Sequence, residues 1–232
     1  MSIFDVDLRP AIDTMVMPLR AQGSRGTCSV FTITFCIEFT LRQRRLVSEP
    51  LSVEYLNWVK NQNHPAPQDG DFFDRIAEGY ERFGMLSEAA LPYAQSYSPE
   101  MPISPELVAQ AEGFPRMNGR FIKPWSVTEI VTEEQIAAIK DHLQNGLPVA
   151  AGLRWPVKGR GLDTVISGHM AMNWIPAEDV FDGHSIALVG YSEAAGLWVF
   201  ANWAGPDWGD HGFGYMTDAY LRAYLNDAYV FE

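Results

Sequence analysis

The longest patterned stretch lies between residues 28 and 45 and fits two kinds of secondary structure. Apolar and polar residues alternate along it, as in a strand, but Phe31, Phe35 and Phe39 also recur at helical spacing. Length favours a helix, because strands seldom exceed about 10 residues. If this helix is buried, its threonines and Glu38 need hydrogen-bond partners inside the protein.

Other segments carry clearer signals. Residues 7–19 are predicted to be extended, with prolines as punctuation, and residues 96–124 to be rich in loops. Start and stop signals predict three further helices, over 51–61 with Ser52 as a cap, 71–83 and 132–145. Nearly continuous apolar runs predict strands over 148–153, 185–191, 197–202 and 212–217. Such strands suit a small closed barrel or a tightly packed sheet.

A turn broken by two glycines, residues 22–27, delivers Cys28 to the start of the long segment. In the first turn of a helix, backbone N–H groups and the positive end of the dipole favour thiolate over thiol, and thiolate is the reactive species. Gln22 can turn its amide towards an oxyanion that forms beside this sulfur, with the backbone N–H of Cys28 as the second donor. Cys28 is therefore a candidate nucleophile.

Two later blocks supply partners for a nucleophilic cysteine. The first runs Gly183-His184-Ser185 into an apolar strand, and the second, residues 200–215, contains Asn202. With these blocks the sequence resembles the papain-like cysteine peptidases, in the chain order Cys, His, Asn. The resemblance extends to residues 51–56 and 80–93 and so covers nearly the whole chain.

The resemblance implies an α+β fold in which a helical half, whose central helix carries the nucleophile, packs against an antiparallel β-barrel-like half. It decides the assignment of residues 28–45 as that helix. We expect a single catalytic domain, 1–232, with a mainly helical subdomain 11–124 and a mainly β subdomain 125–232.

The same resemblance assigns the chemistry. Cys28 attacks the carbonyl, His184 exchanges the proton, Asn202 orients the imidazole and Gln22 stabilises the oxyanion. Four further residues are expected to contact substrate: Gly70, Phe72, Gly183 and Trp203. His169 repeats the Gly-His pair but lacks the apolar strand that should follow. We interpret the remaining histidines, His64, His142 and His211, as structural or solvent-exposed.

Several positions depart from the family pattern. Residues 68–72 stand where the family has a glycine-rich wall that pairs with substrate backbone, and Gly70 alone is retained. Arg25 replaces a cysteine that forms a disulfide in secreted relatives. Ala204 replaces the tryptophan that shields the Asn–His pair, and Trp203 and Trp208 are candidates to cover for it.

These departures leave three functions open. The first is a cysteine peptidase that works through an acyl-enzyme on a peptide or protein substrate. The second is a papain-fold acyltransferase or amide ligase that passes the same acyl group to an amine. The third is a catalytically silent papain-fold binding protein, which the retention of all four chemical positions disfavours.

Composition narrows the classes of protein and of partner that are consistent with the sequence. With 232 residues, 47% hydrophobic and 20% charged, the chain is expected to be globular and soluble. The net charge of -12 excludes a nucleic-acid partner, and no apolar run approaches the roughly 20 residues of a membrane helix. We expect no metal and no cofactor. The absence of a visible signal peptide and of a disulfide framework predicts a cytoplasmic protein, with export not excluded; the oligomeric state stays open.

Overall fold

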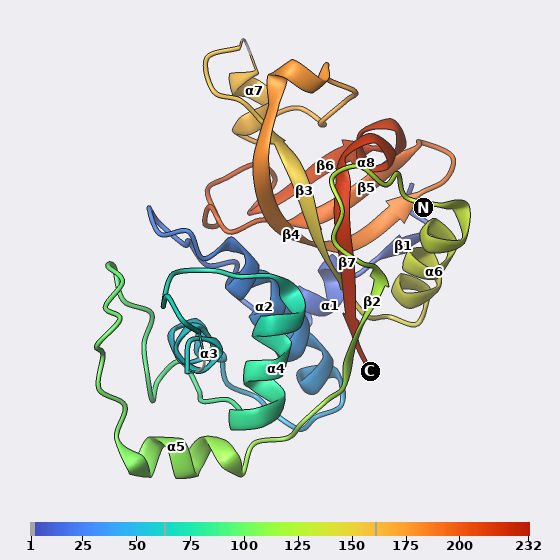
Figure 1. Ribbon diagram of the computed structural model, residues 1–232. Helices are drawn as coiled ribbons and strands as arrows, with labels where there is room; N and C mark the ends of the chain where they lie inside the picture. The colour runs from blue at the N-terminus through green and yellow to red at the C-terminus, as the bar shows by residue number, and fades with distance from the viewer. Residues whose placement is uncertain (1–2, 63, 161) are drawn as a thin grey trace. The chain divides into compact units, whose positions relative to one another are not determined.

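The computed structural model describes residues 3–62, 64–160 and 162–232, which divide between two compact units. Unit 1 comprises residues 1–21 and 121–230, and unit 2 comprises residues 22–120 with 231–232. The predicted α+β class is confirmed: unit 2 is mainly helical, and unit 1 is built on an antiparallel sheet whose strands β3 to β7 run from yellow to red in Figure 1.

Unit 2 is organised around α2, which spans Cys28–Gln43. Every residue from Ser29 to Leu41 is buried, so this helix runs through the core of unit 2 and is covered on all sides. Two helices, α3 (Val53–Lys60) and α4 (Phe73–Phe83), pack against it. The prediction of a helix rather than a strand is confirmed.

Three of the buried polar side chains of α2, those of Thr32, Thr40 and Glu38, have hydrogen-bond partners. Thr32 donates to the carbonyl of Cys28 at 2.9 Å, and Thr40 donates to the carbonyl of Cys36 at 2.8 Å. Glu38 accepts the backbone N–H of Leu51 at 2.9 Å and pairs with Arg42 one turn further on. Glu38 thereby ties the helix to the chain that enters α3.

Capping residues in the sequence predicted the starts of two helices correctly. The Ser52 hydroxyl accepts the backbone N–H of Tyr55 at 2.9 Å and caps α3. Thr132 and Gln135 form a reciprocal capping box at the start of α6 (Glu133–Gln144). Ser104 likewise caps α5 (Pro105–Glu112), a helix within the segment predicted to be loop-rich.

The sheet of unit 1 has the strand order β2-β7-β3-β4-β5-β6, with β1 added alongside β4. The four predicted strands correspond to β3 (Val149–Pro156), β4 (Val180–Ser192), β5 (Leu197–Ala201) and β6 (Phe213–Thr217). Helix α6 packs on β3 and β4, and α8 (Asp218–Tyr224) packs on β3 and β6. Between β3 and β4 lie two short elements, α7 (Asp163–Ile166) and η1 (Ala177–Asp179).

Three expectations need correction. Residues 7–19 are not all extended, because α1 spans Arg9–Thr14 with Pro10 in its first turn, where proline's missing N–H costs nothing. The region 96–124 contains β2 (Gly119–Lys123) as well as α5. The strand β7 (Leu225–Phe231) was not predicted; all seven of its residues are buried, so it shows no alternation.

The two units differ from the expected subdomains 11–124 and 125–232, because unit 2 starts at residue 22, ends at residue 120 and also includes residues 231–232. The first 21 residues belong to unit 1, because β1 (Val6–Asp7) pairs antiparallel with β4, with Val6 opposite Tyr191. Within the described part of the chain, no helix combines the length and the hydropathy needed to span a bilayer.

Candidate active site

Cys28 is the first residue of α2, at the end of the turn formed by residues 22–27. Thr27 occupies the N-cap position, but its side chain does not cap the helix; its hydroxyl lies 2.7 Å from the hydroxyl of Tyr93 instead. The sulfur is therefore carried on the first helical turn, where the dipole favours an anion. Cys28 itself is half-buried, whereas the residues that follow it, from Ser29 to Leu41, are buried.

The turn before Cys28 is fastened at two points. Tyr93 donates its hydroxyl to the backbone carbonyl of Gln22 at 2.9 Å. The Gln22 amide nitrogen donates to the carbonyl of Arg25 at 2.9 Å. That bond uses one of the two N–H groups of the amide, so the second N–H remains for another acceptor. The carboxamide is thus held in place by its own loop.

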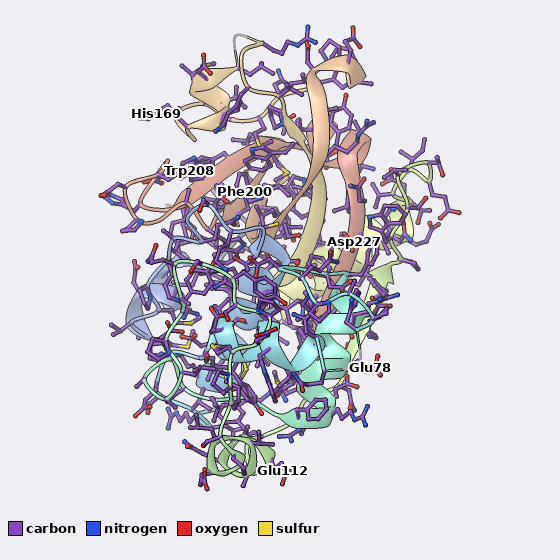
Figure 2. All side chains as sticks on the ribbon, turned by 60° about the vertical axis from the view of Figure 1, so that its left-hand side comes forward. Glu78, Glu112, His169, Phe200, Trp208 and Asp227 are labelled. Carbon is purple, nitrogen blue, oxygen red and sulfur yellow. The ribbon has the colours of Figure 1, made fainter. Side chains whose placement is uncertain are left out.

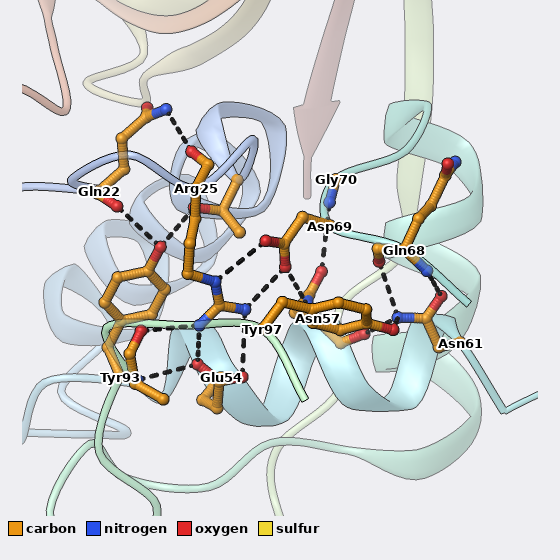
Figure 3. Close-up of polar contacts among 12 residues, drawn as sticks. Gln22, Arg25, Glu54, Asn57, Asn61, Gln68, Asp69, Gly70, Tyr93 and Tyr97 are labelled. Atoms are coloured by element: carbon orange, nitrogen blue, oxygen red, sulfur yellow. Dashed lines mark hydrogen bonds and ion pairs between the residues drawn. The ribbon is translucent and has the colours of Figure 1, made fainter. Parts of the chain in front are cut away.

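Arg25, inside the same turn, is a buried cation at the centre of a polar cluster (Figure 3). Its guanidinium binds Glu54 on α3 and Asp69 in the loop before α4, with shortest contacts of 2.5 and 2.7 Å. Burial by itself lowers the pKa of Arg25, but the hydrogen bonds to the two carboxylates raise it above its ordinary value. The guanidinium of Arg25 therefore stays protonated between the two carboxylates.

The segment 68–71 lies directly against the turn formed by residues 22–27. Gly70 has φ +66°, and a Cβ atom there would stand 2.4 Å from the carbonyl oxygen of Gly26, so glycine is required. On the far side of Cys28, the Ser29 hydroxyl accepts the backbone N–H of Asp71 at 3.1 Å. Phe72 follows and is 45% exposed. The predicted substrate wall thus contacts the turn on both sides of the cysteine.

His184 and Asn202 meet in unit 1. His184 lies in β4 opposite Leu153 of β3, and Asn202 follows the last residue of β5, which pairs with Ala187 of β4. This antiparallel register brings the two side chains together, with His184 Nε2 2.7 Å from Asn202 Oδ1.

The partners of Asn202 determine the imidazole tautomer. Oδ1 also accepts the backbone N–H of Trp203 at 2.8 Å, and since a backbone N–H can only donate, the atom must be oxygen. A carboxamide oxygen only accepts, so Nε2 of His184 carries the hydrogen. In the neutral ring, Nδ1 is then the basic nitrogen. This is the arrangement that a general base needs.

An aromatic contact on His184 comes from a residue that the sequence did not single out. Trp155, just after a register shift in β3, packs edge-on against the imidazole with ring centroids 4.4 Å apart and planes at 61°. Of the two expected candidates, Trp203 donates its indole N–H to the carbonyl of Ser185 at 2.9 Å. Trp208 packs on Phe200, as Figure 2 shows, and donates to the carbonyl of Ile166.

The other histidines lie in different settings. His169 follows α7 in the loop before β4, outside any strand, and its Nδ1 lies 2.7 Å from the Ser167 hydroxyl (Figure 2). His64 Nε2 is 3.5 Å from a carboxylate oxygen of Asp71. His142 is buried on α6, and His211 is an exposed turn residue with φ 54°. Within the described ranges, no three acidic, histidine or cysteine side chains gather as metal ligands do.

The predicted site residues thus form two groups, each described within its own unit. Unit 2 contains Gln22 and Cys28 at the two ends of one turn, Gly70 against Gly26 of that turn, and Phe72 two residues after Gly70. Unit 1 brings together His184, Asn202 and Trp203, with Gly183 preceding the histidine in β4.

Two residues around these groups went unrecognised as contributors. Arg25 was noticed only as a missing cysteine, although a lone arginine beside two glycines and a candidate nucleophile was a usable signal. Trp155 offered no local signal, because its contact with His184 depends on the pairing and the bulge of two strands far apart in sequence.

No model of a known protein family matches the sequence. Among solved structures, the chain is similar to xylellain, a cysteine protease from Xylella fastidiosa, at 16% identity and a TM-score of 0.77, covering 98% of this chain and 85% of xylellain. Digestive procathepsin L 3 of the Tenebrio molitor larval midgut matches at 19% identity and 0.67, covering 97% and 68%. Bromelain from Ananas comosus, in complex with the E64 inhibitor, matches at 16% identity and 0.65, covering 97% of each chain. The protein therefore has the fold of the papain-like cysteine peptidases.

Proposed function

We propose that this protein is a cysteine peptidase in which Cys28 is the nucleophile and His184 its acid–base partner. The observation that carries the proposal is the 2.7 Å contact of His184 Nε2 with Asn202 Oδ1, which leaves Nδ1 as the basic nitrogen. Cys28 lies at the start of α2, where the positive end of the helix dipole favours the thiolate that such a base would serve.

The proposed reaction has two stages. The Cys28 thiolate attacks a peptide carbonyl, and the oxyanion accepts hydrogen bonds from the second N–H of Gln22 and from the Cys28 backbone. Imidazolium His184 then protonates the leaving amine as the C–N bond breaks, which leaves a thioester on sulfur. Water attacks the thioester after giving a proton to the imidazole, and the acid product departs. Asn202 keeps the ring in position throughout.

The test is a cleavage profile of a peptide library with the wild type, Cys28→Ala and His184→Ala. We expect each substitution to lower kcat by at least about 1,000-fold. His169→Ala is the matched control, because it removes a histidine of the alternative Gly-His pair, and it should retain activity. Mass spectrometry after treatment with E64 should find the adduct on Cys28.

Two outcomes would redirect the proposal. When a competing amine is present, an amide product in place of the free acid would indicate acyl transfer, the reaction that the altered residues around Asn202 favour. Alkylation of Cys28 at the rate of an ordinary cysteine, with no cleavage of any peptide, would contradict catalysis and support a binding protein instead.

A further inference from the structure

The guanidinium of Arg25 uses all of its donors. Nε and Nη2 bind the two carboxylate oxygens of Asp69 at 3.0 and 2.7 Å. Nη1 and Nη2 bind the two oxygens of Glu54 at 2.5 and 3.2 Å, and Nη1 also donates to the carbonyl of Ala94 at 2.8 Å. Five N–H groups therefore make five hydrogen bonds, an arrangement that the planar fork of arginine permits and lysine does not.

The cluster is also enclosed by aromatic rings. The central carbon of the guanidinium lies 4.7 Å from the ring centroid of Tyr93 and 5.8 Å from that of Tyr97. The side chains of Arg25 and Glu54 are 4% and 2% exposed, and that of Asp69 is 15% exposed. Ion pairs screened from water to this extent hold their geometry, whereas exposed pairs contribute little.

The two ends of this connection are functionally distinct. Arg25 stands three residues before Cys28, and Asp69 stands immediately before Gly70. Figure 3 shows the guanidinium reaching from the turn to Asp69, which also accepts from Asn57 Nδ2 at 2.9 Å. The same Asn57 accepts the backbone N–H of Gly70 at 3.3 Å. One cation thus links the nucleophile turn to the segment proposed to bind substrate.

The segment 68–71 is held from its other face as well. Lys60, whose side chain is fully buried, donates to the carbonyls of Gln68 and Gly70 at 2.6 and 2.7 Å. Asn61 both donates to the Gln68 carbonyl and accepts its N–H, at 2.9 and 3.1 Å. The segment contains a single glycine, and hydrogen bonds from polar side chains hold its backbone in place. Arg25 connects it to the turn that precedes Cys28.

We propose that Arg25 is a positioning residue that, through Asp69, sets the spacing between Cys28 and the segment 68–71 and thereby determines how tightly the acyl side of a peptide substrate binds. The inference rests on the proposed peptidase function and adds to it the residue that aligns the substrate backbone. An ion pair takes the place here of the disulfide expected of secreted relatives at this point of the chain.

Two variants test the inference. Asp69→Asn keeps the shape of the side chain but removes the charge, and Arg25→Lys keeps the charge but removes the fork. Both are assayed on peptides that extend progressively on the acyl side and for the alkylation rate of Cys28 by iodoacetamide, a reagent too small to need the segment. We expect KM to rise about tenfold for the longest peptide, and the alkylation rate to stay within about twofold.

Arg42→Lys is the matched control. Arg42 pairs with Glu38 at 3.0 Å with side-chain exposures of 7% and 4%, close to those of the Arg25 pair, but lies 14 residues after Cys28 on α2. This variant should leave KM unchanged for every peptide. Thermal unfolding identifies any variant that fails to fold. If Arg25→Lys does not fold, the near-isosteric Asp69→Asn still tests the inference.

The outcomes are separable. An unchanged KM in folded Asp69→Asn overturns the inference. A fall in the alkylation rate as large as the rise in KM also overturns it, since the damage would then reach the cysteine itself. A wild type that cleaves no peptide overturns the peptidase proposal, and this inference with it.

Discussion

The orientation of the His184 ring depends on two neighbours, Asn202 at Nε2 and Trp155 at the ring edge. Aromatic pairs of this geometry contribute about 0.5–1.5 kcal/mol beyond their buried area. Trp155→Leu should lower kcat by roughly tenfold and leave KM nearly unchanged, because the ring samples more orientations once the edge contact is lost. Steady-state kinetics provide the measurement.

Trp125→Leu serves as the comparison, since Trp125 is 49% exposed and removal of an indole there leaves β3 intact. Equal losses of kcat in both variants would argue that Trp155 stabilises the unit in general and does not act on His184.

Thr34 illustrates a residue whose chemistry conflicts with its surroundings. Its hydroxyl is buried within α2 and makes no hydrogen bond with any described residue. Thr34→Val replaces the hydroxyl by a methyl group of similar volume, and it should raise the free energy of unfolding by about 1 kcal/mol. Denaturant unfolding measures the change.

Thr40 is the matched position, on the same helix and equally buried, but its hydroxyl donates to the Cys36 carbonyl at 2.8 Å. Thr40→Val should therefore leave stability unchanged or lower it. A stabilisation by both substitutions would mean that added hydrophobicity, and not the unpaired hydroxyl, is responsible.

At the scale of elements, Lys60 joins α3 to the segment 68–71 and has an unusual proton affinity. Burial lowers its pKa to about 8, against the opposing attraction of Asp71 and Asp69. Between pH 8 and the ordinary pKa of 10.5, the unfolded chain holds a proton that the folded chain has lost, so Lys60 makes stability rise with pH in this window.

Lys60→Met removes this titration at similar length. The unfolding free energy of the wild type, relative to the variant, should therefore increase by up to about 3 kcal/mol between pH 7.5 and 10.5. Chemical denaturation across that range measures the difference. Parallel curves for the two proteins would show that Lys60 keeps its ordinary proton affinity.

At the scale of the whole molecule, the net charge of -12 creates a negative field around the protein. Peptides with added lysines should be captured faster than otherwise identical peptides with added glutamates. The ratio of their kcat/KM values should fall roughly threefold or more as salt rises from low to high ionic strength, because salt screens long-range attraction. A ratio independent of salt would place any charge preference in direct contacts.

The sequence was sufficient for the elements with strong local signals. Residues 28–43 are too many for one strand, and Ser52 and Thr132 cap their helices by contacts three residues away, so these features follow from neighbouring residues. The prediction of the α+β fold rested on the family resemblance of the blocks around Cys28, His184 and Asn202. Pro10 was read as a break, although proline also suits a first helical turn.

By itself, then, the chain determined its central helix, its main strands and the identity of its candidate reactive groups. Tertiary structure alone decided that Trp155 meets His184, that Nδ1 is the basic nitrogen of that ring, and that Arg25 binds Glu54 and Asp69. The reason is physical. Helix caps and periodicity are local, whereas the aromatic contact, the His184–Asn202 hydrogen bond and the buried ion pairs join residues 18 to 44 positions apart and exist only after strands and loops have taken their register.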